Sequence, residues 1–242
     1  MPFLEGIREK FSQLIEAGHL TGEEEVQVVS ARPLTPEEAI GRPERRDFPL
    51  LKGKESMIQA NFKDACGQAY TDMPGNYQGT LKELLALPLR NNYERAIFIA
   101  TLNAVMRHLK LVDRTIHCRD QEPGQCATHL VEYVRERFDN PRIAFIGLQP
   151  AMVAGLAGHF PIRVTDLDPD NVGQRKGGVV IEDASLTDEI IAWSDLVLAT
   201  GTTAVNDTLA GVIGRKPAIF YGVTIAGIAR LAGYEQYCFC GH

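Results

Sequence analysis

The second half of this 242-residue chain alternates apolar runs with segments of helical periodicity. Stretches such as residues 142–147 (RIAFIG) and 195–200 (DLVLAT) are almost unbroken in their hydrophobicity. Strands of this kind are typical of parallel sheets that helices cover on both faces. The pattern therefore predicts an α/β domain over residues 141–242, with right-handed crossovers between its strands. The expected strands are 142–147, 163–168, 178–182, 195–200 and 218–221, and the expected helices are 150–158, 187–193, 202–213 and 224–231.

The first half shows a different order of elements. Strands followed by helices predict an α+β domain over residues 1–112, and residues 113–140 are expected to connect the two domains. Residues 32–53 are rich in Pro and Arg and are expected to be irregular, while Lys63 and Asp64 are expected to form a turn. The expected strands are 26–29, 57–62 and 67–71, and the expected helices are 3–17, 80–87, 93–109 and 127–138.

Composition and charge exclude several classes of function. The formal net charge is −6 and no long block of Lys or Arg occurs, so no nucleic-acid partner is expected. No stretch approaches the roughly 18 apolar residues of a membrane span, and the first residues lack a secretory signal. We therefore expect a cytoplasmic protein without a membrane partner. In that compartment the five cysteines are expected to be free, metal-bound or redox-active rather than disulfide-paired.

Polar residues gather where the predicted parallel strands end. Open parallel sheets bind ligands beyond these ends, so a small-molecule site is expected there. The first turn lacks the sequence G-x-G-x-x-G and carries Pro150, which has no N–H for a pyrophosphate, so NAD is not expected. Asp166 follows Gly147 at a ribose-binding distance, which leaves an adenosine-type ligand open. The candidate residues are Gly147, Gln149, Pro150, Asp166, Asp168, Asn171, Gly201, Thr202, Thr203 and Asn206.

Two polar features each allow two interpretations. Gly201-Thr202-Thr203 is expected to open a helix, where free N–H groups and hydroxyls would bind an anion, or where one threonine is only the N-cap. Asn103 interrupts the apolar run of the helix expected over 93–109. A buried amide requires partners, so Asn103 either ties two elements together or faces a cleft.

Two short clusters contain most of the soft metal ligands. Thiols and imidazoles are the ligands of Zn, of Cu(I) and of iron–sulfur centres, so a transition metal is the candidate cofactor. In an extended chain the three C-terminal ligands would point to one side. Neither cluster has a standard zinc spacing, so structural thiols and a redox-sensitive thiol remain alternatives. The clusters are His117, Cys118 and Cys126, and Cys238, Cys240 and His242.

Several longer motifs carry a family resemblance. They are GQAYTDMPGNYQGTLKELLALPLRNNYERAIFIATLNAVMRHL, TIHCRDQEP, IGLQPAMV, DLDPDNVG, ATGTTAVNDT and FYGVTIAGIA. Over residues 55–242 the chain resembles the prokaryotic family described as putative heavy-metal chelation proteins. The resemblance implies an enolase N-terminal-like α+β domain followed by a Rossmann-like domain, with an active site in the cleft between them. It places near that cleft Asn103, Gln149, Pro150, Asp166, Asp168, Asn171, Gly201, Thr202, Thr203 and Asn206.

Three functional hypotheses follow from these features. In the first, the cleft binds a metal ion or a metal-containing small molecule, with polar strand ends holding the ligand and the Cys/His clusters supplying soft donors. In the second, the protein is an enzyme for an adenosine-type or other anionic metabolite, anchored by Asp166 and by residues 201–203. In the third, the chain is a homo-oligomeric interaction module without small-molecule chemistry.

Overall fold

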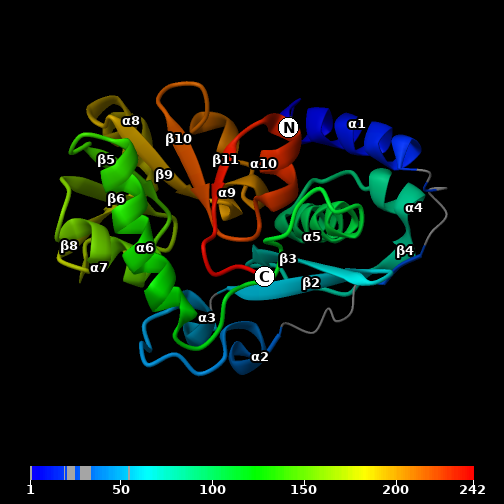
Figure 1. Cartoon of the computed structure of the whole chain (residues 1–242), viewed down its shortest axis with the longest axis horizontal. Coiled ribbons are helices and arrows are strands. Elements are labelled where there is room, and N and C mark those ends of the chain that lie inside the picture. Colours follow the sequence, from blue (N-terminus) through cyan, green and yellow to red (C-terminus); the bar gives the residue numbers. More distant parts are fainter. Residues whose placement is uncertain (1, 19, 21–24, 28–33, 54) are drawn as a thin grey trace.

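The computed structural model describes residues 2–18, 20, 25–27, 34–53 and 55–242. Their strands form two sheets, a small antiparallel one in the first half and a larger, mostly parallel one in the second (Figure 1). The chain is thus an α/β protein of the expected coarse type. Among the described residues, no helix combines the length and the apolar composition that a bilayer crossing requires.

The small sheet has the strand order β3-β2-β1-β4. The predicted hairpin is confirmed, and Lys63 takes a positive φ of 51° in its turn. The strand β4 was not predicted, and the end of the strand expected over 26–29 lies outside the described residues. The strands are β1 (Glu25–Gln27), β2 (Ser56–Phe62), β3 (Ala65–Thr71) and β4 (Gln78–Thr80).

The large sheet has the order β11-β10-β9-β5-β6-β8-β7. All neighbouring strands are parallel except β7, which pairs antiparallel with β8 at one edge. The five predicted strands are present, whereas β7 and β11 were not predicted. The strands are β5 (Ile143–Ile146), β6 (Ile162–Asp166), β7 (Arg175–Lys176), β8 (Val179–Asp183), β9 (Leu196–Thr200), β10 (Ala218–Tyr221) and β11 (Glu235–Tyr237).

Successive residues of the central strands serve two different cores. In β5, Ile143 and Phe145 join a cluster with helices α6 (Glu122–Arg137) and α7 (Pro150–Ala157). Ala144 and Ile146 join a second cluster with α8 (Thr187–Trp193), α9 (Thr202–Val205) and α10 (Ala226–Ala232). Because side chains alternate across a strand, an unbroken apolar run is what such a two-sided sheet requires.

Helix α5 (Asn92–His108) joins the two sheets. Every residue from Arg95 to Met106 is buried, since α5 packs on β3 on one side and on α10 on the other (Figure 1). Gly67 of β3 permits this approach, because a Cβ there would stand 2.3 Å from the backbone nitrogen of Ala104. Helix α1 (Pro2–Ala17) also contacts α10, and the rings of Phe3 and Tyr234 stack beside it.

Several helix boundaries differ from the prediction. Residues 32–53 are not wholly irregular, because Pro residues open the short helices α2 (Pro36–Ile40) and α3 (Pro49–Lys52). The helix α4 (Leu81–Leu85) is shorter than expected. Helix α9 ends early, where Asp207 adopts a φ of 58°, and a 3₁₀ turn (Leu209–Gly211) follows. Helix α6 begins before residue 127, so Cys126 lies on a helix rather than in a loop.

Candidate functional site

A cavity of about 960 Å³, called the cleft below, lies at the carboxyl ends of the parallel strands. This volume is within the range of small-molecule sites, roughly 300–1,000 Å³. Its wall includes the residues at or just after the ends of six strands of the large sheet: Gly147, Asp166, Ala184, Thr200, Tyr221 and Cys238. Glu55, Tyr70, Asp72 and Asn92 contribute from the first half of the chain. The parallel sheet therefore supplies most of the wall, as predicted, and the first half completes it.

Four residues with carboxyl groups, Glu55, Asp72, Asp166 and Asp168, line the cleft and are called the carboxylate cluster below. Burial, together with the charges of the three aspartates, raises the pKa of Glu55 to about 7. None of the described residues that line the cleft is Lys or Arg. The described lining therefore carries carboxyl groups and no basic Lys or Arg side chain. The sequence analysis did not predict Glu55 and Asp72 as site residues, because neither follows a strand of the parallel sheet.

Asp166 has a structural task as well as a place in the wall. Its carboxylate accepts hydrogen bonds from the backbone N–H of Leu148 at 2.6 Å and of Asp168 at 2.9 Å, and from Asn171 Nδ2 at 3.0 Å. Lys176 reaches the same region and donates to Asn171 Oδ1, which offsets part of the local negative charge. These bonds fix the loops after β5 and β6 and leave Asp166 fewer lone pairs for a ribose.

Asn92 connects the two halves of the wall. Its Nδ2 donates to Asp72 Oδ1 at 2.7 Å and to Asn206 Oδ1 at 3.2 Å. Its Oδ1 accepts from the buried Arg95, whose other donors hold the carbonyls of Leu89 and Val205. Asn206 is thus where the sequence placed it, beside the cleft. Asn92 carries no sequence signal, since it looks like an ordinary first-turn residue of α5.

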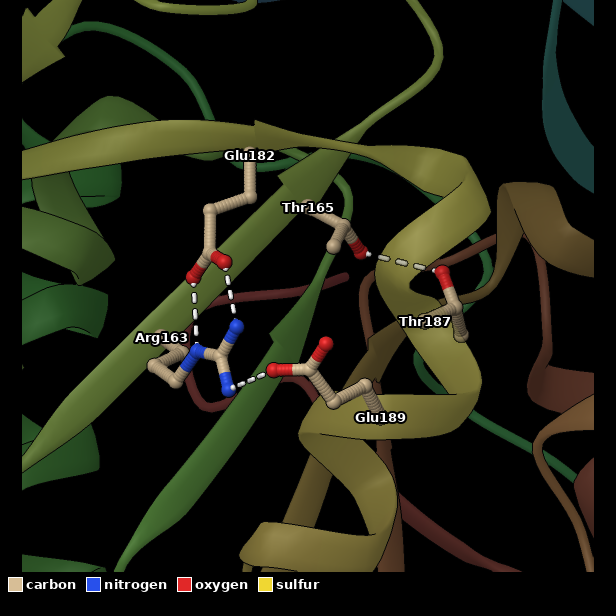
Figure 2. Close-up of polar contacts among 5 residues, drawn as sticks. All are labelled: Arg163, Thr165, Glu182, Thr187 and Glu189. Carbon is tan, nitrogen blue, oxygen red and sulfur yellow. Dashed lines mark hydrogen bonds and ion pairs between the residues drawn. The ribbon is translucent and has the colours of Figure 1, made fainter.

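Threonine side chains of β6 and α8 also contribute to the wall. Thr165 and Thr187 both line the cleft, and their Oγ1 atoms are 3.3 Å apart (Figure 2). On the same strand, Arg163 donates to Glu182 of β8 and to Glu189 of α8. Figure 2 shows this guanidinium held between the two carboxylates. The network ties β6, β8 and α8 together and so fixes the spacing of the two threonines.

The residues 201–203 differ from both interpretations in detail. Gly201, and not a threonine, is the N-cap of α9, which has only four residues. Thr203 Oγ1 donates to the carbonyl of Thr200 at 2.7 Å, and Thr200 Oγ1 donates to Thr202 Oγ1 at 3.1 Å. Thr202 and Thr203 line the cleft, but their hydroxyls are bonded largely within this turn. Of the two interpretations, the one that makes a threonine the N-cap is therefore wrong.

The two Cys/His clusters meet in space. His242 and Ile116 pair through their backbones, with N···O distances of 2.7 and 2.9 Å, and Thr115 N also donates to His242 O. Cys238 directly follows β11, so this unpredicted strand brings the C-terminal thiols to the same edge as the other strand ends. His117, Cys118, Cys126 and Cys238 all line the cleft and are called the thiol cluster below.

The sequence suggested an extended C-terminal segment, but the structure shows a turn there. Gly241 N donates to Cys238 O at 3.3 Å, which closes a turn and separates the three ligands. Cys238 is buried, Cys240 is half-buried near Cys126, and His242 is exposed. The His242 imidazole lies 3.2 Å from a carboxylate oxygen of Glu122. The last two ligands, Cys240 and His242, are not among the residues that line the cleft.

Three members of the thiol cluster, His117, Cys118 and Cys238, are uncharged at neutral pH. Burial, aided by the neighbouring thiols, raises the pKa of Cys118 far above its usual range and that of Cys238 to about 12. Burial also lowers the pKa of His117 to about 4, so its imidazole is neutral. Its Nδ1 is buried and has no hydrogen-bond partner among the described residues. A neutral imidazole with an unpaired nitrogen is the form that binds metals.

A bare metal ion nevertheless does not fit this arrangement. Among the described residues, no group of three or more His, Cys, Asp or Glu side chains is placed to hold one. The thiol cluster has the right donor types, but its mutual geometry is not that of a closed metal site. A metal that already carries other ligands needs only one or two donors from the protein.

Of the eleven residues predicted outside the Cys/His clusters, three do not line the cleft. Asn103 Nδ2 donates to the carbonyls of Gln68, Val223 and Thr224, and its Oδ1 accepts from Gly227 N. It therefore ties β3 to the turn before α10, and its bonding capacity is used. Pro150 opens α7, and Gly201 packs so closely on Ile225 that a Cβ would meet its nitrogen at 2.7 Å. The other eight of these eleven line the cleft: Gly147, Gln149, Asp166, Asp168, Asn171, Thr202, Thr203 and Asn206.

Comparison with known proteins agrees with the motifs quoted above. The model of the family DUF364, described as "Putative heavy-metal chelation", matches residues 129–230. These residues belong to the DUF364 family. The matched segment covers most of the large sheet and supplies the strand-end loops from β5 to β10.

Two solved DUF364 structures of unknown function share the fold. One, from Pyrococcus horikoshii, is 18% identical, with a TM-score of 0.57 over 92% of this chain and 79% of its own. The other, from Desulfitobacterium hafniense DCB-2, is 14% identical, with a TM-score of 0.50 over 75% of this chain and 74% of its own. No curated protein matches the chain. The DUF364 likeness therefore establishes the fold of the chain.

Proposed function

We propose that the cleft binds a cationic metal complex, meaning a metal ion already held by a small organic chelator. The observation that carries this proposal is the composition of the wall. One cavity of about 960 Å³ combines the carboxylate cluster with the thiol cluster and has no described Lys or Arg in its lining. The family description, heavy-metal chelation, is consistent with such a ligand.

The charge of the wall favours a cation. A phosphate-bearing ligand would meet the carboxylate cluster without a lining cation to balance its own charge. The adenosine-type alternative also loses its anchor, because Asp166 is engaged by Leu148, Asp168 and Asn171. The anionic-metabolite hypothesis therefore ranks below the metal-complex hypothesis.

The size of the cleft and its soft donors favour a complex over a free ion. A single ion fills a small fraction of the cavity, and the described residues offer it no ready three-ligand site. His117 Nδ1 and one thiol of the thiol cluster would complete the coordination of a chelated soft metal. Apolar residues such as Phe48, Leu50 and Met152 would cover the organic part of the chelator. An open cleft of this size also speaks against the pure interaction module.

Zinc(II) bound to terpyridine is a suitable test ligand, because it is cationic and aromatic and keeps open coordination positions. Isothermal titration calorimetry should show that it binds at least about tenfold more tightly than free Zn²⁺, since the chelator buries apolar surface. Cys118→Ser together with Cys238→Ser should weaken the binding. The matched control Cys66→Ser lies outside the cleft lining and should bind like the unaltered protein.

Two outcomes would contradict the proposal. One is equal or tighter binding of free Zn²⁺, which would indicate a site for the bare ion. The other is saturable binding of ATP or S-adenosylmethionine without binding of the zinc complex, which would favour the anionic or adenosine-type alternative. Loss of binding in the control Cys66→Ser would indicate a general effect of thiol removal.

The finer fold assignment is part of the same proposal. The small sheet with α5 would be an enolase N-terminal-like domain over residues 1–112, and the large sheet a Rossmann-like domain over 141–242. Residues 113–140, which include α6, would connect them. The separate sheet orders β3-β2-β1-β4 and β11-β10-β9-β5-β6-β8-β7 support this division.

A further inference from the structure

The segment 237–242, called the strap below, packs along one face of α6. Three side-chain pairs hold it there: an imidazole 3.2 Å from a carboxylate oxygen, two stacked rings with centroids 3.6 Å apart, and two tilted rings at 5.1 Å. In this order the pairs are Glu122 with His242, His129 with Phe239, and Tyr133 with Tyr237. The helix positions are seven and four residues apart, so they share one face, and the strap has one register on it.

Cys126 and Cys240 meet in the middle of this contact. Cys126 follows Glu122 by four positions and so lies on the same face of α6. Cys240 directly follows the stacked Phe239 in the strap. It packs against the hydrophobic cluster that contains Cys126, and the two thiols share a side-chain hydrogen bond. The phenol of Tyr237 also donates to the carbonyl of Cys126 at 2.7 Å, so contacts on both sides hold the two sulfur atoms together.

The thiols of the chain differ in exposure. Cys118, Cys126 and Cys238 are buried, whereas Cys240 is half-buried. Cys66 is also half-buried, but it lies outside the thiol cluster and donates to Asn61 Oδ1 at 2.9 Å. Intramolecular disulfide formation requires one thiol that a reagent can reach and a second thiol beside it that displaces the reagent. Cys240 meets the first condition, and Cys126 meets the second.

We propose that Cys126 and Cys240 form a reversible disulfide in the presence of a small disulfide such as oxidised glutathione. The Cys240 thiol loses its proton to water and attacks one sulfur of the reagent, whose S–S bond breaks to release one thiol. The Cys126 thiolate then attacks the Cys240 sulfur, the mixed S–S bond breaks, and a second thiol leaves. The two protein thiols thereby lose two electrons and two protons, which the reagent takes up as two thiols.

The disulfide would alter the thiol end of the cleft. Cys126 lines the cleft and Cys240 does not, so the bond withdraws one soft donor from the wall. Tyr237 and Cys238 of the strap also line the cleft, and the bond would fix them against α6. Cys118 and Cys238 would remain as free thiols. The disulfide forms whether or not the cleft takes up a metal complex, so its test is separate from the zinc titration.

Oxidised glutathione is the reagent for the test. The full chain is incubated with it, the remaining thiols are alkylated after denaturation, and unreduced peptides are mapped by mass spectrometry. The expected result is a main cross-link between the Cys126 and Cys240 peptides, which dithiothreitol reverses, with Cys118 and Cys238 alkylated. In Cys126→Ser, glutathione bound to Cys240 should increase by at least about tenfold, because no adjacent thiol displaces it.

Cys66→Ser is the matched control and should form the cross-link like the unaltered protein. Circular dichroism confirms that both variants are folded. A main cross-link from Cys126 to Cys118 or to Cys238 would overturn the inference, as would glutathione that stays on Cys240 in the unaltered protein. Absence of any cross-link, or its loss in the Cys66→Ser control, would overturn it equally.

Discussion

The side-chain amide of Asn92 donates a hydrogen bond to the carboxylate of Asp72 at 2.7 Å. Asn92 begins α5, and Asp72 follows β3, so the bond fixes the edge of the small sheet against the helix that joins both sheets. The same amide reaches Asn206 at the end of α9. One neutral side chain thus holds together the two parts of the cleft wall.

Replacement of Asn92 by Asp should disturb this junction. The new carboxylate would face Asp72 instead of donating to it, and like charges at this distance repel. We expect a loss of about 1–3 kcal/mol in the free energy of unfolding at pH 7, because a hydrogen bond is lost and a repulsion is added. Urea denaturation measures the loss, which should shrink as acid protonates one of the two groups. Asn76→Asp, at an exposed loop position, should change stability little, and an equal loss there would argue against a specific role of the junction.

The carboxyl group of Glu55 should make folding less favourable at high pH. Its pKa rises from 4.5 to about 7 on folding, so the folded state binds the proton more tightly than the unfolded state. Stability is therefore greatest below about pH 4.5 for this group and falls as pH rises through 7. Glu55→Gln should remove that fall and raise the free energy of unfolding at pH 9 by about 2–3 kcal/mol. Identical pH profiles of the two proteins in chemical denaturation would show that Glu55 ionises freely.

The thiol cluster should resist alkylation in the folded protein. Cys118 and Cys238 are buried, and their raised pKa values leave almost no thiolate at pH 8. Iodoacetamide followed by peptide mass spectrometry should label both only after unfolding. Cys240, half-buried at the C-terminal turn, should react earlier than Cys118. Rapid labelling of Cys118 in the native protein would mean that the cleft end is open and its thiol ionised.

Gly67 should be irreplaceable at the contact of β3 with α5. An added Cβ would stand 2.3 Å from Ala104 N and 2.4 Å from Ala100 O, and neither backbone atom moves without displacing the helix. We expect Gly67→Ala to lower the melting temperature strongly, with a cost of about 3 kcal/mol or more. Gly6→Ala is the matched control, because no atom lies within 4 Å of a Cβ at this position in α1. It should stabilise the protein by about 0.5–1 kcal/mol, and two effects of the same sign would contradict the packing argument.

The local sequence pattern was sufficient to predict an element wherever its hydrophobic period alone decided its structure. The apolar run of β5 predicts a two-sided strand, and the same pattern in β6 and β9 predicts that Asp166, Thr202 and Asn206 lie at or just after strand ends. The β2–β3 hairpin was equally predictable from its short turn. By contrast, β11 consists of Glu235, Gln236 and Tyr237, which have no strand pattern, and it forms because β10 offers a free parallel edge.

The sequence by itself determined a parallel-sheet half whose strand ends carry polar residues, because strand periodicity and burial are local properties. Only the tertiary structure decided which residues share the cleft. It brought Glu55 and Asn92 to strand ends more than a hundred positions away in Asp166 and Asn206, and it joined Cys118 to Cys238 through the pairing of Ile116 with His242. The charge state of Glu55 and of the thiols depends on burial and on neighbours distant in sequence. Electrostatic and packing interactions act through space, so no local pattern in the chain encodes them.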